Sequence, residues 1–199
     1  MGLAKRWDHK LIYELIDPGS SVLDLGCGDG GLLAGLIEKK RVIGQAVETD
    51  PECVAMAIQN GVPVYHKNLD HGLPEFISSS YDYAVLEKTL QQLRRPMFVL
   101  EEMLRISRLS IVSFPNFNYR EVVSQLYQTG RMPVTETLPY RWHDTPNIHL
   151  FTLLDFLDWV ESRGVEIVGG YANDGFSYRP LSMPDDSSSA EELLFLLKQ

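Results

Sequence analysis

Cysteine and long apolar segments are scarce in this 199-residue sequence. The two cysteines, Cys27 and Cys53, lack metal-ligand spacing, and an isolated pair gives no evidence of a disulfide framework. No apolar run approaches the ~20 residues of a membrane helix, and the first ten residues are not followed by the apolar core of a secretory signal. We therefore expect a cytoplasmic protein with reduced thiols, no membrane association and no metal site.

Positive charge is also scarce, with 18 lysine and arginine residues against 27 aspartate and glutamate residues. The resulting formal net charge of −9 repels a phosphate backbone, so nucleic acid is not an expected partner. The densest basic stretch, residues 39–41, is interpreted as the solvated end of a helix.

What is present is a regular alternation of strand-like and helix-like segments. Short apolar runs predict five strands, at 21–25, 42–47, 62–66, 81–86 and 109–114. Segments with helical spacing of leucine, isoleucine and valine separate several of these runs, and a helix over 8–16 would cap one edge. Successive strand–helix units predict a doubly wound α/β sheet with parallel strands. The chain length suits one domain over 1–199.

The pattern changes after the fifth predicted strand. We interpret 117–151 as an insertion that begins with a helix and continues as an aromatic and proline-rich loop, because a loop this long is usually functional. A helix from Leu153 to Gly164 and a strand over 165–171 follow. The Ser-, Asp- and Pro-rich stretch 173–190 is predicted to be a mobile linker, and 192–198 a strand or a short helix.

The strongest local signal is the glycine-rich turn after the first predicted strand. Gly26, Gly28 and Gly31 satisfy the spacing of a dinucleotide-binding turn, which would indicate NAD. However, Asp24 and Asp29 bracket this turn, and two carboxylates would repel a pyrophosphate. They suit a ligand with an ammonium or sulfonium group, so S-adenosylmethionine is favoured over NAD.

Polar residues also follow the next two predicted strands. Glu48 ends the second strand, where a carboxylate can bind both ribose hydroxyls. Asn68 and Leu69 follow the third strand, where a polar side chain and a backbone N–H can recognise adenine. Each residue alone could equally be a helix cap. Their position at the ends of successive strands indicates an adenosyl site.

Several segments resemble a known family. VLDLGCGDG is similar to the first motif of class I methyltransferases, and residues 7–168 resemble the methionine biosynthesis protein MetW family. The most specific of the matching segments is GRMPVTETLPYRWHDTPNIHLFT. The resemblance implies a three-layer Rossmann-like fold with a mostly parallel seven-stranded sheet whose last strand, at 192–198, is antiparallel. It also implies partnership with the homoserine O-acyltransferase MetX.

The same resemblance implies roles for individual residues. Asp24, Gly26 and Gly28 would bind the methionine end of S-adenosylmethionine or S-adenosylhomocysteine, Glu48 the ribose, and Asn68 and Leu69 the adenine. The expected cofactor site is completed by Cys27, Thr49 and Glu87. Asn68 stands where such motifs usually have aspartate, Glu87 where a small polar residue is expected, and His143 where tyrosine is expected.

Catalytic residues are harder to assign, because methyl transfer needs little beyond positioning and a base. Glu87, His143 and His149 are the candidate bases, although a histidine in a polar loop is more often a surface residue. The insertion is alternatively a lid or a recognition surface, because Tyr140, Arg141 and Trp142 are typical of interfaces. Two functions therefore remain open, a regulatory partner of the acyltransferase and an active methyltransferase on a small molecule.

Overall fold

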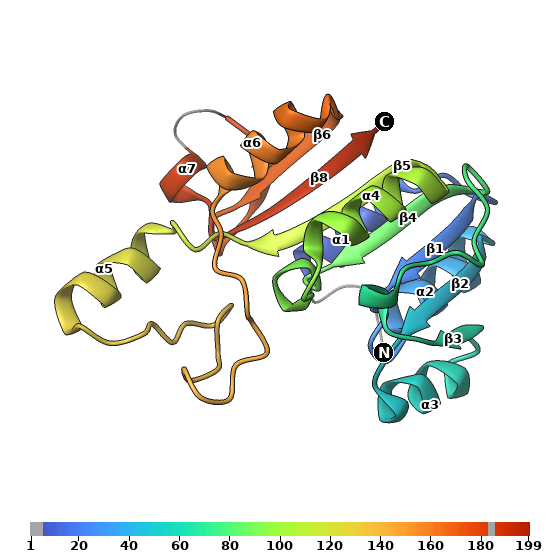
Figure 1. Cartoon of the computed structure of the whole chain (residues 1–199), viewed down its shortest axis with the longest axis horizontal. Coiled ribbons are helices and arrows are strands. Elements are labelled where there is room, and N and C mark those ends of the chain that lie inside the picture. Colours follow the sequence, from blue (N-terminus) through green and yellow to red (C-terminus); the bar gives the residue numbers. More distant parts are fainter. Residues whose placement is uncertain (1–5, 183–185) are drawn as a thin grey trace.

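Within residues 6–182 and 186–199, which the computed structural model describes, eight strands form one sheet (Figure 1). The strand order is β3-β2-β1-β4-β5-β8-β6-β7. The strands are β1 (Ser21–Leu25), β2 (Ile43–Glu48), β3 (Val64–His66), β4 (Tyr81–Glu87), β5 (Ser107–Pro115), β6 (Glu166–Asn173), β7 (Tyr178–Pro180) and β8 (Glu192–Lys198). The first five are parallel, whereas β8 is antiparallel to both β5 and β6. The predicted fold class is thereby confirmed, including the antiparallel strand at the end of the chain.

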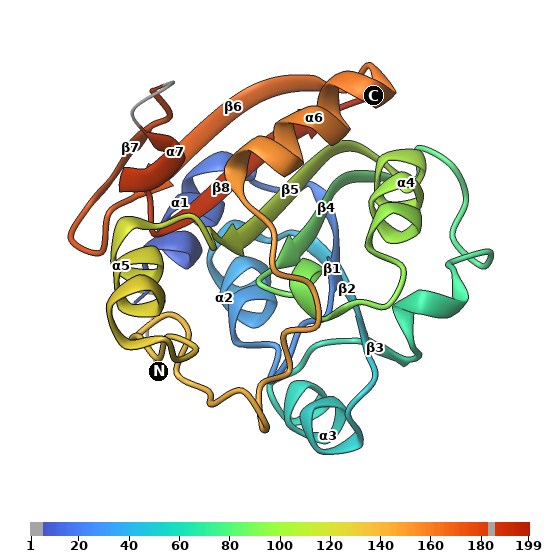
Figure 2. The same ribbon diagram turned by 60° about the vertical axis from the view of Figure 1, so that its left-hand side comes forward.

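Helices cover both faces of this sheet (Figures 1 and 2). The helices are α1 (Trp7–Leu15), α2 (Gly31–Lys40), α3 (Pro51–Gln59), α4 (Pro96–Ile106), α5 (Arg120–Thr129), α6 (Leu153–Arg163) and α7 (Asp186–Ser189), with 3₁₀ turns η1 (Leu69–His71) and η2 (Leu90–Gln92). Alternate residues of a strand point to opposite faces, so Val22 packs with α1, α2 and α3 while Leu23 packs with α4 and α6. The two resulting cores hold the carboxyl ends of the strands in place.

The prediction that the first helix caps a sheet edge is wrong. Leu11 and Ile12 of α1 are buried in the same core as the apolar residues of α2. Because Leu11, Ile12 and Leu15 recur at helical spacing, the helix has an apolar stripe that is buried against a sheet face. This position brings the start of α1 close to the end of β4, where Glu87 pairs with His9.

The stretch 173–190, predicted as a mobile linker, contains regular structure that the sequence pattern did not indicate. Strand β7 pairs with β6 as a hairpin and adds one strand to the expected seven. In α7, Asp186 is fully buried and accepts a hydrogen bond from Arg179 Nη1 at 2.8 Å and from the Ser182 backbone N–H at 2.6 Å. Residues 183–185 of this stretch lie outside the described part of the chain.

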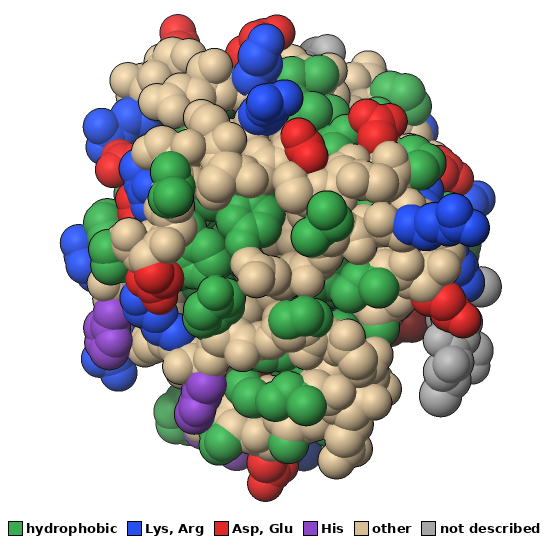
Figure 3. Space-filling model, turned by 90° about the vertical axis from the view of Figure 1, so that its right-hand side faces the viewer, with side chains coloured by type: hydrophobic (Ala, Val, Ile, Leu, Met, Phe, Trp, Pro, Cys, Tyr) green, Lys and Arg blue, Asp and Glu red, His purple; other side chains and the backbone are tan. Residues whose placement is uncertain are grey.

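The side of the molecule formed by β2, β3 and α3 carries exposed apolar residues such as Ile43, Ile58 and Tyr65. Figure 3 views this side and shows apolar side chains separated by polar and backbone atoms, with charged side chains toward the rim. Scattered apolar groups of this kind are ordinary on a protein surface. No helix in the described part of the chain has the length and apolar character needed to cross a membrane.

Candidate cofactor site

The turn after β1 has a backbone that depends on glycine. Gly26, Gly28 and Gly30 all have positive φ angles, of 81°, 55° and 74°. The Gly26 N–H donates to the Val47 carbonyl at 2.8 Å, which fixes the turn to the end of β2. A Cβ at Gly26 would lie 2.7 Å from Thr89 Oγ1, whereas a Cβ at Gly28 would meet no atom within 4 Å. Gly26 is therefore required by packing, while Gly28 faces open space where a ligand can approach the backbone.

Alanine substitutions at Gly26 and Gly28 are expected to distinguish an effect on stability from an effect on cofactor binding. Gly26→Ala combines a left-handed backbone with a steric clash, so we expect the free energy of unfolding to fall by roughly 2–5 kcal/mol. Gly28→Ala meets no clash and is expected to cost only about 1–2 kcal/mol. Its methyl group would nevertheless occupy the open space over the turn, so cofactor binding should be lost.

Denaturant unfolding and calorimetric titration of the two variants measure these effects. A Gly28→Ala variant that binds S-adenosylmethionine as the native protein does would contradict the placement of the ligand over this turn.

Asp24 is the least compensated carboxyl group among the predicted cofactor-site residues. It lies on β1 beside the turn and is 3% exposed. Among the residues that the structure describes, none donates a hydrogen bond to its carboxylate. Burial raises the pKa of Asp24 well above its ordinary value, and the negative charges of Glu87 and Glu48 raise it further. A cationic ligand group beside Asp24 would offset both effects.

Glu48 connects the second strand to the glycine turn. Its Oε2 accepts from the Gly28 N–H at 2.9 Å, and its Oε1 accepts from the N–H groups of Thr49 and Asp50 at 2.7 and 3.0 Å. The carboxylate thus orders both the backbone of the glycine turn and the backbone that follows β2. Each carboxylate oxygen can accept more than one hydrogen bond, so Glu48 retains acceptor capacity for hydroxyl groups.

Asn68 and Leu69 lie at the next strand end, as predicted. Asn68 caps η1, with its side-chain oxygen accepting from the Asp70 N–H at 2.9 Å, and Leu69 is buried. The neighbouring Lys67 N–H donates to the Glu48 carbonyl at 2.8 Å, which joins this segment to β2. The capping role of Asn68 is the alternative that the sequence left open, and it orders the start of η1.

Cys27 lies within the turn as a half-buried free thiol. Burial, followed by the charges of Asp24 and Glu48, raises its pKa to about 12. The thiol is therefore protonated at neutral pH and is not a nucleophile, because the thiolate is the reactive form.

Glu87, at the end of β4, forms an ion pair with Arg6, and His9 Nε2 lies 3.0 Å from its Oε2. Asp8, His9 and Glu87 place ligand-type atoms within 4.8 Å of one another, but the pairs of Arg6 and Lys88 with these carboxylates already balance their charge. The cluster is consequently an ion-pair network between α1 and β4.

The three candidate bases lie in different parts of the fold. His143 is exposed in the insertion, with its ring edge-on to Trp142 at a centroid distance of 5.5 Å. His149 lies in a small cavity beside Trp159 of α6, and its Nε2 has no hydrogen-bond partner within the described residues. Neither histidine is joined to Glu87 by a hydrogen bond or ion pair in that part of the chain. The structure brings together the predicted binding residues but not the predicted bases.

Sequence reasoning missed Lys88 and Gln91, which lie between β4 and α4. Lys88 adopts a left-handed backbone with φ of 48° and forms ion pairs with Asp8 and Glu192. Gln91 is 4% exposed, and its backbone carbonyl accepts hydrogen bonds from the backbone N–H groups of Ile148 and His149. Both residues belong to the segment EKTLQQLRRP, but their partners are far away in sequence.

Comparison with solved structures agrees with this fold. A Mesorhizobium loti S-adenosylmethionine-dependent methyltransferase superposes with a TM-score of 0.73 over 100% of both chains at 15% identity. A chain of the Haloferax volcanii complex between the Trm112 methyltransferase activator and a methyltransferase gives 0.69, at 19% identity, covering 99% of this chain and 92% of that one. The [4+2]-cyclase SpnF gives 0.68 at 14% identity, covering 100% and 85%. The presence of a cyclase among these structures means that the fold alone does not specify methyl transfer.

Sequence comparison is more specific. A bifunctional methionine biosynthesis protein, MetXA/MetW, of Rhodopirellula baltica is 38% identical over 169 residues, which are 80% of this chain and 27% of that protein. The chain therefore spans about a quarter of this relative's length. Residues 6–196 match the family model described as methionine biosynthesis protein MetW. The chain belongs to the MetW family of methionine biosynthesis proteins.

Proposed function

We propose that this protein binds S-adenosylmethionine at the candidate cofactor site and acts as a partner of a homoserine O-acyltransferase of the MetX type. The observation that carries the partnership is the relative in which a MetW segment and a MetXA segment form one chain. Two activities fused in one protein are commonly separate chains that work together elsewhere. Because methionine is the precursor of S-adenosylmethionine, a protein that binds this compound could report the pathway's product to an early enzyme.

Cofactor binding is supported by the charges of the site. The ammonium of the methionine end lies against Asp24, which has no cationic partner within the described residues and whose pKa is raised by burial. Glu48 accepts hydrogen bonds from the ribose hydroxyls, and the Asn68–Leu69 segment borders the adenine. The open space over Gly28 allows the ligand to approach the turn without contacting a side chain there.

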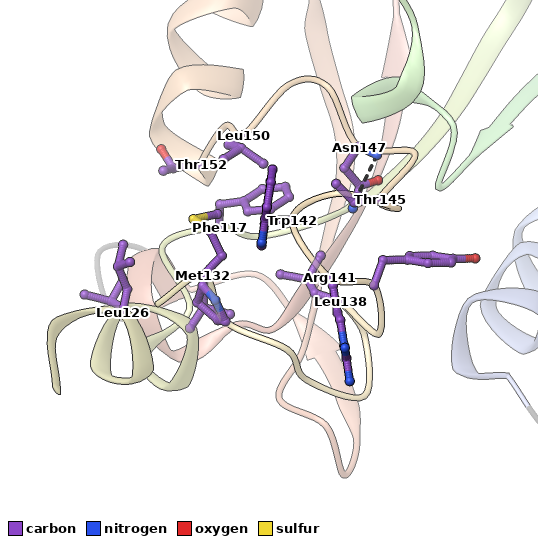
Figure 4. Close-up of a pocket in the computed structure, with 14 residues that line it drawn as sticks. Phe117, Leu126, Met132, Leu138, Arg141, Trp142, Thr145, Asn147, Leu150 and Thr152 are labelled. Atoms are coloured by element: carbon purple, nitrogen blue, oxygen red, sulfur yellow. Dashed lines mark hydrogen bonds between the residues drawn. The ribbon is translucent and has the colours of Figure 1, made fainter. Parts of the chain in front are cut away.

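The insertion 117–151 offers a surface for the partner. Its apolar side chains border a cavity of about 300 Å³ between α5, the loop and the start of α6 (Figure 4). Leu126, Met132 and Trp142 are 45%, 48% and 75% exposed, and Figure 4 shows them around the same hollow as Phe117 and Leu150. A contiguous group of exposed apolar side chains with an aromatic anchor is typical of protein interfaces.

Calorimetric titration with S-adenosylmethionine and with S-adenosylhomocysteine, alone and with the cognate acyltransferase, tests both parts of this proposal. We expect saturable binding of each compound, an affinity that changes when the acyltransferase is present, and co-elution of the two proteins in size-exclusion chromatography. Absence of binding in both conditions would contradict the cofactor. Failure to co-elute, together with an unchanged acyltransferase rate, would contradict the partnership.

An active methyltransferase is the second candidate, favoured by a cavity of about 630 Å³ at the same end of the sheet. Incubation with S-adenosylmethionine and small-molecule acceptors would release S-adenosylhomocysteine if this activity exists. The two candidates are compatible, because one bound cofactor could serve as signal and as methyl donor.

A further inference from the structure

The open cavity of about 630 Å³ is lined by four parts of the chain that are distant in sequence. Its walls come from the start of α1, the segment after β4, the insertion, and the region joining β6 to β8. The insertion carries Glu136 and Tyr140 into this wall, and the chain just before β8 carries Glu191. A cavity of this volume accommodates a small organic molecule.

The positive charges of this cavity are already neutralised. Arg6 forms ion pairs with Asp8 and Glu87, and Lys88 forms ion pairs with Asp8 and Glu192. Because both cations are occupied by carboxylates, an anionic ligand would find no unpaired cation among the described lining residues.

Two carboxylates that line the cavity, by contrast, are not neutralised. Glu136 and Glu191 have no cationic partner within the described part of the chain, and Glu191 Oε1 accepts only the Thr137 hydroxyl, at 2.8 Å. Burial raises the pKa of Glu191, and the charges of Glu192, Glu121 and Glu136 act in the same direction. An ammonium group in the cavity would relieve this accumulation of carboxylates.

A buried acceptor supplies an independent indication. Gln91 lines the cavity and is 4% exposed. Its Nε2 donates to the Lys88 carbonyl at 2.7 Å, but its Oε1 has no partner within the described residues. An unpaired buried acceptor costs about 1–3 kcal/mol, so a ligand with a suitable N–H or O–H donor is favoured there.

Aromatic side chains complete the lining. Trp7, Tyr140 and Phe176 border the cavity, and the faces of aromatic rings attract cations. Unpaired carboxylates, an acceptor without a donor and aromatic rings all favour a positively charged ligand.

We propose that this cavity binds an organic cation with N–H donors, that is, a primary or secondary amine, whose ammonium group lies against Glu191. The inference goes beyond the proposed cofactor and partner, since it concerns a second ligand, and it gives a chemical class to the occupant of the cavity that favours the methyltransferase candidate.

Matched pairs of amines and alcohols test this assignment by calorimetry or ligand-observed NMR. The probes are n-butylamine with 1-butanol, phenethylamine with 2-phenylethanol, and putrescine with 1,4-butanediol. At least one amine is expected to bind, and to bind about tenfold more tightly than its alcohol, which corresponds to about 1.4 kcal/mol. If no amine is preferred over its alcohol in any of the three pairs, the proposal is wrong.

Variants locate the binding to this cavity. Glu191→Gln keeps the hydrogen bond with Thr137 but removes the charge, and Gln91→Leu removes the buried acceptor. Each is expected to reduce amine affinity at least fivefold, whereas Glu161→Gln, at an exposed site on α6, leaves it unchanged. Amine binding that neither variant weakens would place the ligand elsewhere and overturn the assignment. The same variants are also titrated with S-adenosylmethionine. This second titration distinguishes a wrong assignment of the amine site from a wrong assignment of the cofactor site.

Discussion

Asparagine at position 24 is expected to stabilise the free protein and, at the same time, to weaken S-adenosylmethionine binding by roughly 30-fold, or about 2 kcal/mol. Asp24 is a buried carboxyl with two carboxylates nearby and no hydrogen-bond donor among the described residues. The amide has nearly the same shape but cannot ionise, so the cost of a buried charge disappears. The same change removes the charge that attracts the ligand's ammonium group.

The stability difference is expected to depend on pH in a defined direction. Burial, then Glu87 and Glu48, give Asp24 a higher pKa in the folded protein than in the unfolded chain. As pH rises above the unfolded value of about 4, the unfolded chain loses this proton first, so the native protein loses stability until the folded pKa is passed. Asp24→Asn lacks this loss. Its advantage in melting temperature should therefore be small near pH 4 and grow toward neutral pH.

Calorimetry offers a second measurement of the same group. A cation bound beside Asp24 lowers the pKa of the carboxyl again, so the native protein is expected to release protons on binding. Titration in two buffers with different ionisation enthalpies detects this release. Asp24→Asn should abolish the contribution, whereas Asp158→Asn, at an exposed site on α6, should leave both binding and proton release unchanged. Native affinity in Asp24→Asn would contradict our assignment of the ligand's ammonium group.

The sequence was sufficient to predict those parts of the site that depend on strand ends. Apolar runs locate the strands, and parallel strands bring Gly26, Glu48 and Asn68 to one edge of the sheet. The hydrogen bond from the Gly28 N–H to Glu48, which the sequence pattern did not predict, joins two of these strand ends. These are consequences of local pattern and of a topology with few alternatives.

The side-chain network beyond the strand ends could not be predicted in this way. Glu87 pairs with Arg6, and Trp7 donates to Glu192, 185 residues further along the chain. The apolar stripe of α1 indicates that the helix packs on a sheet face, but it does not specify which strand ends its first residues reach. β7 was also missed, because three residues within a polar stretch are too short to show alternation.

The alternatives of lid and interface for the insertion are not exclusive. Tyr140 and Asn147 line both the apolar hollow on its outer side and the cavity proposed to bind an amine. A partner that moved these two residues on docking would change the affinity of the cavity for its ligand. Because coupling between two binding sites is reciprocal, the ligand would change the affinity for the partner by the same factor.

Trp142→Ala is expected to weaken binding of the homoserine O-acyltransferase at least 30-fold, or about 2 kcal/mol, without weakening S-adenosylmethionine binding. Trp142 is 75% exposed and borders the apolar hollow, so a docked partner would bury a large aromatic surface there. The side chain contributes little to the packing of the free protein, so its loss should change the melting temperature only slightly. Surface plasmon resonance with immobilised acyltransferase measures the effect.

Ile77→Ala is the matched control for this prediction, because Ile77 is 76% exposed and lies outside the insertion, between β3 and β4. Equal losses of affinity in both variants would mean that exposed apolar area in general drives the association. If Trp142→Ala binds the acyltransferase with native affinity, the partner docks on another surface. That result would not affect the assignment of the cofactor site. A selective loss in Trp142→Ala would instead assign the outer side of the insertion to the acyltransferase, because the two side chains are almost equally exposed and differ in where they lie.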